Sequence, residues 1–235
     1  MPIGTMKTIG VIGGMSWEST AEYYRLMNTY VRDELGSLHS ARILMYSCDF
    51  AEIERMQQAG DWEQMAGVLG RWALNLEQAG AELMVIATNT MHRVAPGVQS
   101  SISVPLIHIA DATAEAAREI GLSRLGLLGT RFTMEQDFYR QKLACDHGIE
   151  VLVPSCAGRS LVHDVIYDEL CQGIVRSGSR EAIGQVIDGL VERGAEGIIL
   201  GCTELPLLIR DEDVDVVRLD TTAIHARAAV RAALG

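Results

Sequence analysis

Two stretches of the sequence end an apolar run in a short polar tip, and one of these tips carries a thiol. "AELMVIATNT" spans Ala81–Thr90, and "AEGIILGCTE" spans Ala195–Glu204. When the two stretches are aligned from their shared Ala-Glu, Thr88 falls opposite Cys202, at an offset of 114 residues. A hydroxyl and a thiol at equivalent positions could act on two sides of one small molecule.

The chemistry that suits two opposed groups is inversion at a carbon atom. One group removes a proton, and the other returns a proton to the opposite face. A cysteine thiol, with an ordinary pKa of about 8.5, becomes a base when nearby donors or a helix N-terminus lower its pKa. "TELPLLIR" after Cys202 predicts a helical turn, which favours this role. A threonine hydroxyl is a far poorer base, so Thr88 suits donation to a carbanion.

The elements that position these tips follow from hydrophobic periodicity. Short apolar runs at residues 7–14, 41–50, 82–87, 105–110, 123–130, 149–155 and 196–202 predict strands. The segments between most of them carry apolar residues at helical spacing and end in glycine, which predicts helices, including one capped by Asp111 and one at residues 133–148. Alternating strands and helices indicate an α/β fold with parallel sheets.

The second half of the chain repeats the order of the first. Gly10 and Gly13 in "KTIGVIGG" align with Gly126 and Gly129 in "SRLGLLGT", at an offset of 116 residues. "DTTAIHARAAVRAAL" from position 220 echoes "DATAEAAREI" from position 111, at an offset of 109 residues. Any α/β protein gives single echoes, but three echoes in the same order favour a duplicated βα unit.

We therefore expect two similar parallel-sheet α/β lobes related by pseudo-twofold symmetry. The first lobe is expected at residues 1–110, completed by a C-terminal helix at 220–235, and the second at 111–219. Ligands of such sheets collect at the carboxyl ends of the strands. The active site is expected in the cleft between the lobes, where Thr88 and Cys202 would meet a bound molecule from opposite sides.

Composition narrows the classes of partner. The net charge of −11 argues against nucleic acid or an anionic membrane. We find no apolar run of eighteen residues and no signal-peptide pattern, and the five cysteines are scattered without a CxxC or zinc-like spacing. A cytoplasmic protein without a bound metal is expected. The glycine spacing after the first strand is not GxGxxG, so a dinucleotide site is disfavoured.

Further site candidates lie at other predicted strand ends. Met15 follows Gly13 and Gly14, where the lack of side chains lets the backbone approach a ligand. Thr130 and Thr133 end the matching strand of the second half and could bind a carboxylate through hydroxyl and backbone donors. The alternative for both threonines is an ordinary helix cap.

Four motifs in order resemble the aspartate/glutamate racemase family. They are "KTIGVIGGMSWES" at 7–19, "TNTMH" at 88–92, "LLGTRFTMEQDFYR" at 127–140 and "GCTEL" at 201–205. The similarity runs along essentially the whole chain and is greatest to the bacterial branch of L-aspartate/glutamate and broad-specificity amino-acid racemases. The resemblance implies a cofactor-independent, two-lobed α/β enzyme that commonly forms a homodimer and acts on a small amino acid.

The resemblance also implies roles for individual residues. Family members usually carry a cysteine in each tip, so Thr88 departs from the commonest pattern while Cys202 keeps it. Asn89, Thr90 and Thr203 match positions that hold substrate carboxylates, although Thr203 could equally cap a helix. Gln57 matches a position that lines the family's cleft. Glu204 either orients the thiol or occupies a helix start. For His92, which follows the tip closely, a structural role is the simpler interpretation.

Two departures from the residues usual in the family bear on the substrate and on the two half-reactions. Related aspartate racemases often carry a lysine in the helix near "GRSLVHDVIYDEL", where Leu161 stands here and Arg159 lies close. Aspartate or glutamate is still favoured, with neutral amino acids open. The resemblance suggests that L-substrates present their proton to Cys202, with slow reprotonation from Thr88. Two other functions stay open: a single-cysteine decarboxylase or isomerase of the same superfamily, and an amino-acid-binding protein without catalysis.

Overall fold

The internal contacts of the chain divide it into two compact units. The first comprises the described residues up to His108 together with His225–Gly235, and the second is Ile109–Ile224. The structure, a computed structural model, describes residues 6–235, so the first five residues of the predicted first lobe lie outside the described residues. The boundaries that the sequence analysis places at 110 and 220 stay a prediction.

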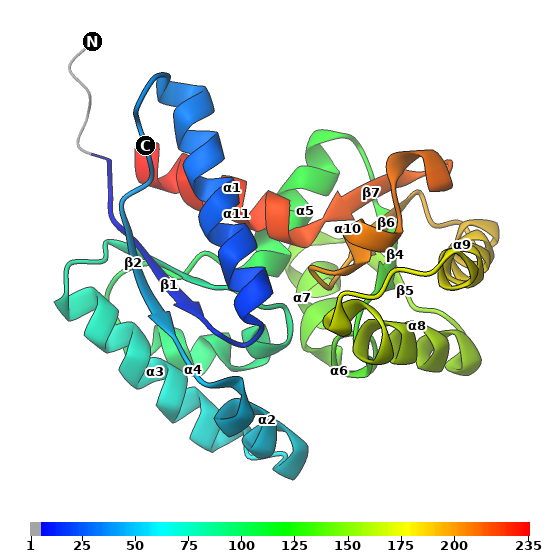
Figure 1. The fold of residues 1–235 in the computed structure, drawn as a ribbon, viewed down its shortest axis with the longest axis horizontal. Coiled ribbons are helices and arrows are strands. Elements are labelled where there is room, and N and C mark those ends of the chain that lie inside the picture. The colour runs from blue at the N-terminus through cyan, green and yellow to red at the C-terminus, as the bar shows by residue number, and fades with distance from the viewer. Residues whose placement is uncertain (1–5) are drawn as a thin grey trace. The chain divides into compact units, whose positions relative to one another are not determined.

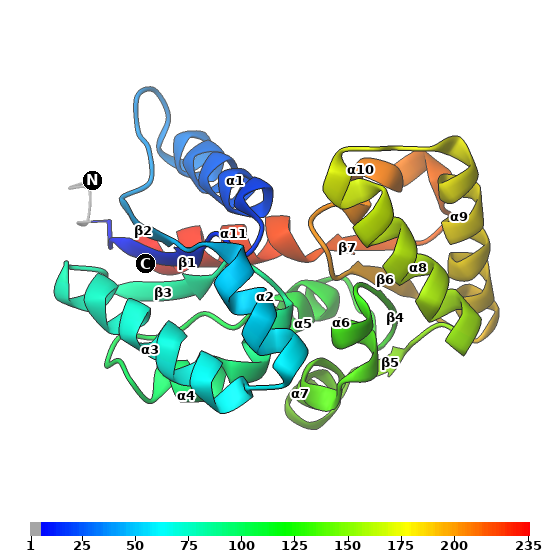
Figure 2. The same ribbon diagram turned by 60° about the horizontal axis from the view of Figure 1, so that its bottom comes forward.

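The first unit is built on a parallel sheet with the order β2-β1-β3; β1 and β2 are labelled in Figure 1, and all three strands in Figure 2. All five residues of β1 are buried, and so are all four residues of β3. Such continuous apolar runs are typical of central parallel strands, which helices cover on both faces. β2, at the edge of the sheet, is half-buried or exposed along its length.

The elements of the first unit follow the predicted alternation of strands and helices. α1 starts at the Ser16 cap, whose side chain accepts from the backbone N–H of Ser19, and α2 starts at the Asp49 cap. The elements are β1 (Ile9–Gly13), α1 (Trp17–Leu35), β2 (Ile43–Ser47), α2 (Phe50–Ala59), α3 (Trp62–Gln78), β3 (Leu83–Ile86), the 3-10 helix η1 (Thr90–Val94) and α4 (Ala95–Gln99).

The second unit is built on a parallel sheet with the order β5-β4-β6-β7. Figure 2 shows α8 and α9 packed side by side within this unit. The elements are α5 (Ile109–Glu119), β4 (Arg124–Leu128), α6 (Arg131–Glu135), α7 (Asp137–His147), β5 (Glu150–Leu152), α8 (Cys156–Asp168), η2 (Leu170–Gln172), α9 (Ser177–Glu192), β6 (Gly197–Leu200), α10 (Leu205–Leu208), η3 (Asp211–Asp213), β7 (Val217–Asp220) and α11 (Thr221–Leu234). From His225 onward, the residues of α11 belong to the first unit.

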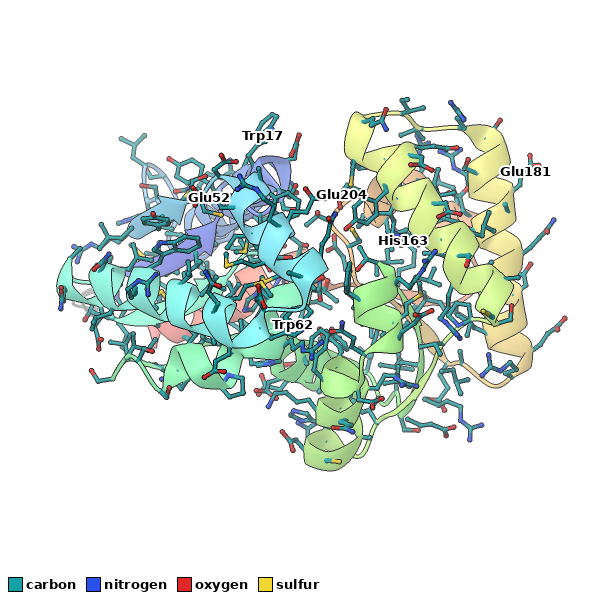
Figure 3. All side chains as sticks on the ribbon, turned by 90° about the horizontal axis from the view of Figure 1, so that it is seen from below. Trp17, Glu52, Trp62, His163, Glu181 and Glu204 are labelled. Atoms are coloured by element: carbon teal, nitrogen blue, oxygen red, sulfur yellow. The ribbon has the colours of Figure 1, made fainter. Side chains whose placement is uncertain are left out.

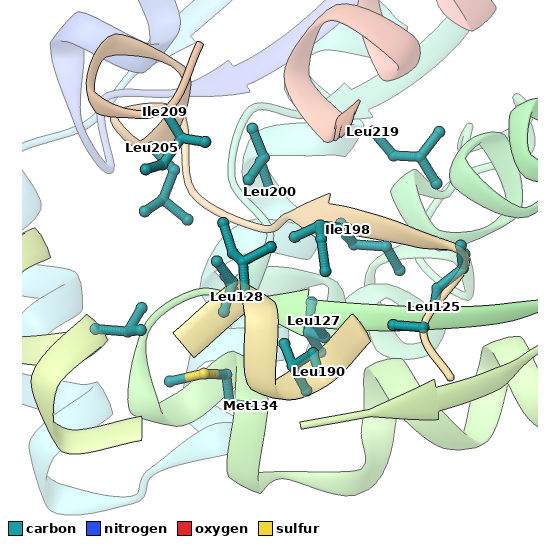
Figure 4. Packing of buried hydrophobic residues seen from close by; sticks show 14 of the residues in the cluster. Leu125, Leu127, Leu128, Met134, Leu190, Ile198, Leu200, Leu205, Ile209 and Leu219 are labelled. Carbon is teal, nitrogen blue, oxygen red and sulfur yellow. The ribbon is translucent and has the colours of Figure 1, made fainter. Parts of the chain in front are cut away.

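Leucine and isoleucine side chains from the strands form the core of the second unit (Figure 4). Leu127, Ile198 and Leu200 are fully buried, and Leu205 of α10 packs into the same cluster. Each such side chain contributes about 2 kcal/mol by leaving water. α10 is thus held by the core directly after the Cys202 tip.

The two sheets repeat the same strand order and the same local hydrogen bonds. In the first unit the backbone N–H of Ala87 donates to the carbonyl of Ile12 at 2.8 Å. In the second, Gly201 donates to Leu128 at 2.7 Å. Because each of these bonds ends a strand beside the central strand of its sheet, Thr88 and Cys202 occupy equivalent positions. This equivalence supports the duplication inferred from the sequence.

Three local expectations differ from the structure. Residues 105–110 form an isolated parallel bridge at Leu106 instead of a strand, because Pro105 lacks an N–H and α5 already begins at Ile109. The helix expected from residue 133 is interrupted at Gln136, whose backbone is extended. Asp111 lies inside the first turn of α5 and therefore does not cap it.

Candidate active site

In the first unit, the tip after β3 is shaped by tight backbone turns. The N–H of Thr88 donates to the carbonyl of Ile86 at 2.8 Å, and the N–H of His92 donates to the carbonyl of Asn89 at 3.1 Å. Thr88 and Thr90 are half-buried, whereas Asn89 is buried. The three residues Thr88–Thr90 therefore form one tip at the carboxyl end of β3, where two of their side chains reach the surface.

The neighbouring tip after β1 depends on glycine. Gly14 has φ +91°, and a Cβ there would lie 2.3 Å from the backbone nitrogen of Cys48. The N–H of Gly14 donates to Thr20 Oγ1 at 2.9 Å. Met15 then turns its side chain into the hydrophobic cluster of the first unit. Because that side chain is buried, Met15 could contact a ligand through its backbone.

Gln57 is buried on α2, with 8% of its surface exposed. Its neighbours Ile53 and Met56 pack into the same cluster as Met15. An amide in such surroundings needs hydrogen-bond partners, which makes Gln57 more than a solvated helix residue.

In the second unit, the tips after β4 and β6 lie side by side because these strands pair. The hydroxyls of Thr130 and Thr133 are 3.3 Å apart, and Thr133 is fully buried. A Cβ at Gly201 would lie 2.9 Å from the carbonyl oxygen of Leu128 and 3.4 Å from a methyl carbon of Thr133. Only glycine therefore lets the chain before Cys202 approach the Thr130–Thr133 tip so closely.

One carboxylate joins the polar side chains of the Cys202 tip. Cys202 Sγ donates to Glu204 Oε2 at 2.8 Å, and Thr203 Oγ1 donates to the same oxygen at 2.8 Å. Glu204, marked in Figure 3, is buried with 8% of its surface exposed. Both alternatives open from the sequence occur together, because Glu204 is the N-cap residue of α10 and its carboxylate accepts the hydrogen bond of the thiol.

The expectation that the surroundings of Cys202 lower its pKa is wrong. Burial raises the pKa of this thiol well above its ordinary value, and the charge of Glu204 and its hydrogen bond to the thiol raise the pKa further. The helical turn that follows, Leu205–Leu208, is too short to offset these effects. Without a bound ligand, Cys202 is therefore a protonated thiol at neutral pH.

The helix α8 presents a different side chain to the Thr130–Thr133 tip than the sequence suggested. Leu161 packs against the core and lines a groove between α8 and α9. Arg159 donates to Glu135 at 3.0 Å and to the carbonyl of Pro154 at 2.9 Å. His163, marked in Figure 3, accepts at Nδ1 from the N–H of Arg131 at 3.3 Å. The hydrogen bond between Arg131 and His163 could not be predicted from the spacing of residues along α8 alone.

His163 is neutral at pH 7 in this position. Its partial burial lowers the pKa of the imidazole, and the charge of Arg131 lowers it further. Because Nδ1 accepts a hydrogen bond, the proton of the neutral ring lies on Nε2, which is a donor. Arg131 directly follows Thr130 and adds a cation to this tip.

The structure therefore gathers the predicted residues into two sets. Met15, Thr88, Asn89 and Thr90 lie on adjacent strand ends of the first unit, and Thr130, Thr133, Cys202 and Thr203 lie on adjacent strand ends of the second. Gln57 lies in the same unit, on α2. Within residues 6–235, no group of three or more His, Cys, Asp or Glu side chains is arranged to hold a metal ion, and no helix is long and apolar enough to span a membrane.

A fold of parallel α/β units with polar groups at the strand ends defines a class of small-molecule enzymes. A profile of the Asp/Glu/hydantoin racemase family matches residues 12–229. The chain belongs to this family, and it is an isomerase of the racemase type.

Solved structures agree with this assignment. A Yersinia pestis protein assigned as an Asp/Glu racemase is 52% identical, with a TM-score of 0.94 over 98% of this chain and 100% of that one. An aspartate racemase homologue from Pyrococcus horikoshii is 38% identical, with a TM-score of 0.87 over 97% and 99% of the two chains. The broad-specificity amino-acid racemase RacX of Bacillus subtilis is 21% identical over 94% of this chain and 96% of its own length.

Proposed function

We propose that this enzyme interconverts L- and D-amino acids without a cofactor, using Cys202 and Thr88 on opposite faces of the α-carbon. The observation that carries the proposal is the equivalence of the two strand ends, each fixed by the same backbone hydrogen bond beside the central strand. Family membership supports the reaction type. Because L- and D-amino acids have equal energy in solution, both directions share an equilibrium constant of one.

Glu204 supplies the step that makes Cys202 a base. The thiol already donates to Oε2 of Glu204, so its proton moves onto the carboxylate and leaves a thiolate. The ammonium group of the substrate favours this transfer, because a positive charge lowers the pKa of a nearby thiol. The thiolate then removes the α-proton, and the resulting carbanion accepts a proton from the Thr88 hydroxyl. Water reprotonates the Thr88 alkoxide and takes the proton from Glu204, which restores both groups.

The weaker acid sets the slower half-reaction. A threonine hydroxyl gives up its proton far less readily than a thiol does, so inversion through Thr88 is slow. Cys202 meanwhile returns a proton, exchanged with solvent, to the face from which it came. Proton exchange without inversion should therefore be faster than inversion for the enantiomer that faces Cys202, which we propose is the L-form.

The remaining residues at the tips are proposed to bind the substrate. Asn89, Thr90 and Thr203 offer side-chain and backbone donors to the α-carboxylate, and Thr130 and Thr133 offer donors beside Arg131. In this proposal, Met15 contacts the substrate through its backbone, and the buried amide of Gln57 provides a polar group beside the substrate.

We propose aspartate or glutamate as the favoured substrate, with neutral amino acids accepted more weakly. The Nε2–H of His163 lies at the Thr130–Thr133 tip with Arg131, which pairs with the exposed Asp164 only at 4.0 Å, and these two groups would stabilise a side-chain carboxylate. Arg159 is engaged by Glu135 and does not supply this charge. The names of the relatives, which include aspartate, glutamate and broad-specificity racemases, are compatible with either choice.

We further propose that the enzyme is a cytoplasmic homodimer that binds neither nucleic acid nor membrane. The scattered cysteines and the net charge of −11 support the compartment and the exclusions. Dimerisation is typical of the family that the sequence resembles. Light scattering at two protein concentrations would test the oligomeric state.

The test of the proposed function is chiral chromatography of single enantiomers incubated with the enzyme. The panel contains L- and D-forms of Asp, Glu, Ala, Met and Lys. We expect inversion of Asp or Glu, and Cys202→Ser should lower it at least about 100-fold. Cys145→Ser is the matched control, because Cys145 is an exposed thiol in α7 of the same unit. Inversion by Cys202→Ser at the wild-type rate would refute the proposal.

A further inference from the structure

The 3-10 helix η1 places a buried histidine directly behind Thr88. His92 Nδ1 lies 2.8 Å from the carbonyl oxygen of Thr88, and 1% of the residue's surface is exposed. A carbonyl can only accept, so Nδ1 carries the proton and donates it. Nε2 of the neutral ring is then an acceptor, and it has no hydrogen-bond partner among residues 6–235.

Two other rings, the half-buried His108 and the fully buried His225, contact His92. Its ring meets His108 edge-on at a centroid distance of 4.6 Å and His225 at 5.3 Å. His225 is held in turn, because its Nε2 donates to the carbonyl of Ile107 at 2.8 Å and its Nδ1 accepts from the Tyr23 hydroxyl at 2.7 Å. His92 therefore has little freedom to rotate.

The segment that carries His92 is anchored on its flanks as well. The guanidinium of Arg93 lies 3.9 Å from the ring centroid of Trp62 on α3, which is marked in Figure 3. Met91 and Val94 are buried in the hydrophobic cluster of the first unit. η1 is thus a rigid platform, and its His92 reaches the Thr88 tip with a hydrogen bond.

We propose that His92 is a positioning residue for Thr88. By donating to the carbonyl of Thr88, His92 fixes the backbone from which the Thr88 hydroxyl projects, and so fixes the direction of that hydroxyl. This inference rests on the proposed function, in which Thr88 serves one half-reaction and Cys202 the other. His92 is buried although its Nε2 makes no hydrogen bond to the described residues, and its role in orienting the Thr88 hydroxyl gives a reason for this costly placement.

The two half-reactions separate this role from a merely structural one. If His92 positions Thr88, His92→Ala should impair inversion and spare the exchange at Cys202, which lies in the other unit. A displacement of about 1 Å at a reacting group lowers a rate about 100-fold. His92→Asn should restore most of the lost inversion, because its Nδ2 occupies the place of the imidazole Nδ1 and donates equally.

The experiment measures both rates for the favoured L-amino acid in D2O. NMR follows loss of the α-proton, chiral chromatography follows inversion, and circular dichroism gives the folded fraction of each variant. We expect inversion by His92→Ala to fall about 10- to 100-fold with Cys202-dependent exchange within about 3-fold of wild type. His92→Asn should invert within about 5-fold of wild type.

Two control variants measure how much a substitution in the first unit lowers activity through nonspecific structural effects. Tyr23→Phe removes a hydroxyl from the same buried network without touching Thr88, and His39→Ala changes an exposed histidine of the same unit. The inference is overturned if inversion by His92→Ala equals that of Tyr23→Phe, or if exchange and inversion fall together. Wild-type enzyme that neither exchanges nor inverts any amino acid would overturn the proposed function itself, and this inference with it.

Discussion

At the residue scale, the acidity of the Cys202 thiol depends on burial and on Glu204. Both raise the pKa of the thiol in the free enzyme. The same carboxylate accepts the thiol's hydrogen bond and is placed to take its proton. In the proposed reaction, Glu204 keeps the thiol protonated until a substrate with a positive charge binds.

Glu204→Gln should lower the pKa of Cys202, because the substitution removes the negative charge that disfavours the thiolate. The pH dependence of iodoacetamide labelling at Cys202, read by mass spectrometry, measures this shift. We expect the midpoint of labelling to move to lower pH. Glu181→Gln, an exposed carboxylate on α9, is the control and should leave the midpoint unchanged. A midpoint that moves to higher pH in Glu204→Gln would contradict the assigned role.

His163 should set the preference for acidic side chains. His163→Ala removes the Nε2 donor beside the Thr130–Thr133 tip, and a hydrogen bond to a charged group contributes about 1.5 kcal/mol or more. We expect kcat/KM for aspartate or glutamate to fall about 10-fold relative to that for a neutral amino acid. Leu161→Ala on the same helix is the control, because its side chain lines the groove between α8 and α9. An equal change in selectivity in both variants would refute this assignment.

At the element scale, the strand ends need glycine where the chain passes close to a neighbour. Gly14→Ala places a Cβ 2.3 Å from the nitrogen of Cys48 at φ +91°, so both sterics and backbone conformation oppose it. We expect a loss of about 3 kcal/mol or more in the free energy of unfolding. Gly60→Ala also has a positive φ but meets nothing within 4 Å, and it should lose about 1 kcal/mol. Urea unfolding would measure both; equal losses would contradict the account.

The elements and the positions of the tips could be predicted from the sequence. β1, β3 and β6 are continuous apolar runs, and each parallel strand must deliver its last residue to the same edge of its sheet. This rule is enough to place Thr88 and Cys202 at strand ends from the sequence alone. The glycine echoes predicted the repeat because the same close packing recurs at Gly10 and Gly126.

The side-chain contacts at those tips could not be predicted. The direction in which the Cys202 pKa shifts depends on burial by tertiary packing and on the hydrogen bond between the thiol and Glu204. Local residue spacing determines neither of these. The cluster of His92, His108 and His225 joins residues more than a hundred positions apart. The spacing of Thr88 and His92 within a helical turn was the one available signal for their contact.

At the scale of the whole molecule, the buried histidines make stability depend on pH. Burial lowers the pKa of His225 to about 4 and that of His92 well below its ordinary value. The unfolded chain therefore binds more protons than the folded one between about pH 4 and pH 6.5, and stability falls as the pH drops through this range. The groups that face His225 are Tyr23, His92 and His108, and protonated histidines would repel one another.

Urea unfolding at pH 7.5 and pH 5.0 checks this dependence. His225→Gln keeps a donor for the carbonyl of Ile107 but does not titrate in this range. We expect the wild type to lose about 2 kcal/mol more than His225→Gln between the two pH values. His39→Ala should lose as much as the wild type, because its imidazole is exposed. The same loss in His225→Gln and wild type would show that His225 does not carry the effect.

Proton NMR of L- and D-amino acids with the enzyme in D2O under reducing conditions would show whether Cys202 and Thr88 divide the reaction as proposed. Aspartate, glutamate and several neutral amino acids form the panel, with Cys202→Ser and Thr88→Ala as variants. We expect loss of the α-proton signal from one enantiomer faster than inversion, dependence of this exchange on Cys202, and loss of inversion but not exchange in Thr88→Ala. Exchange that survives Cys202→Ser, or equal rates of exchange and inversion from both enantiomers, would refute the proposed roles of Cys202 and Thr88.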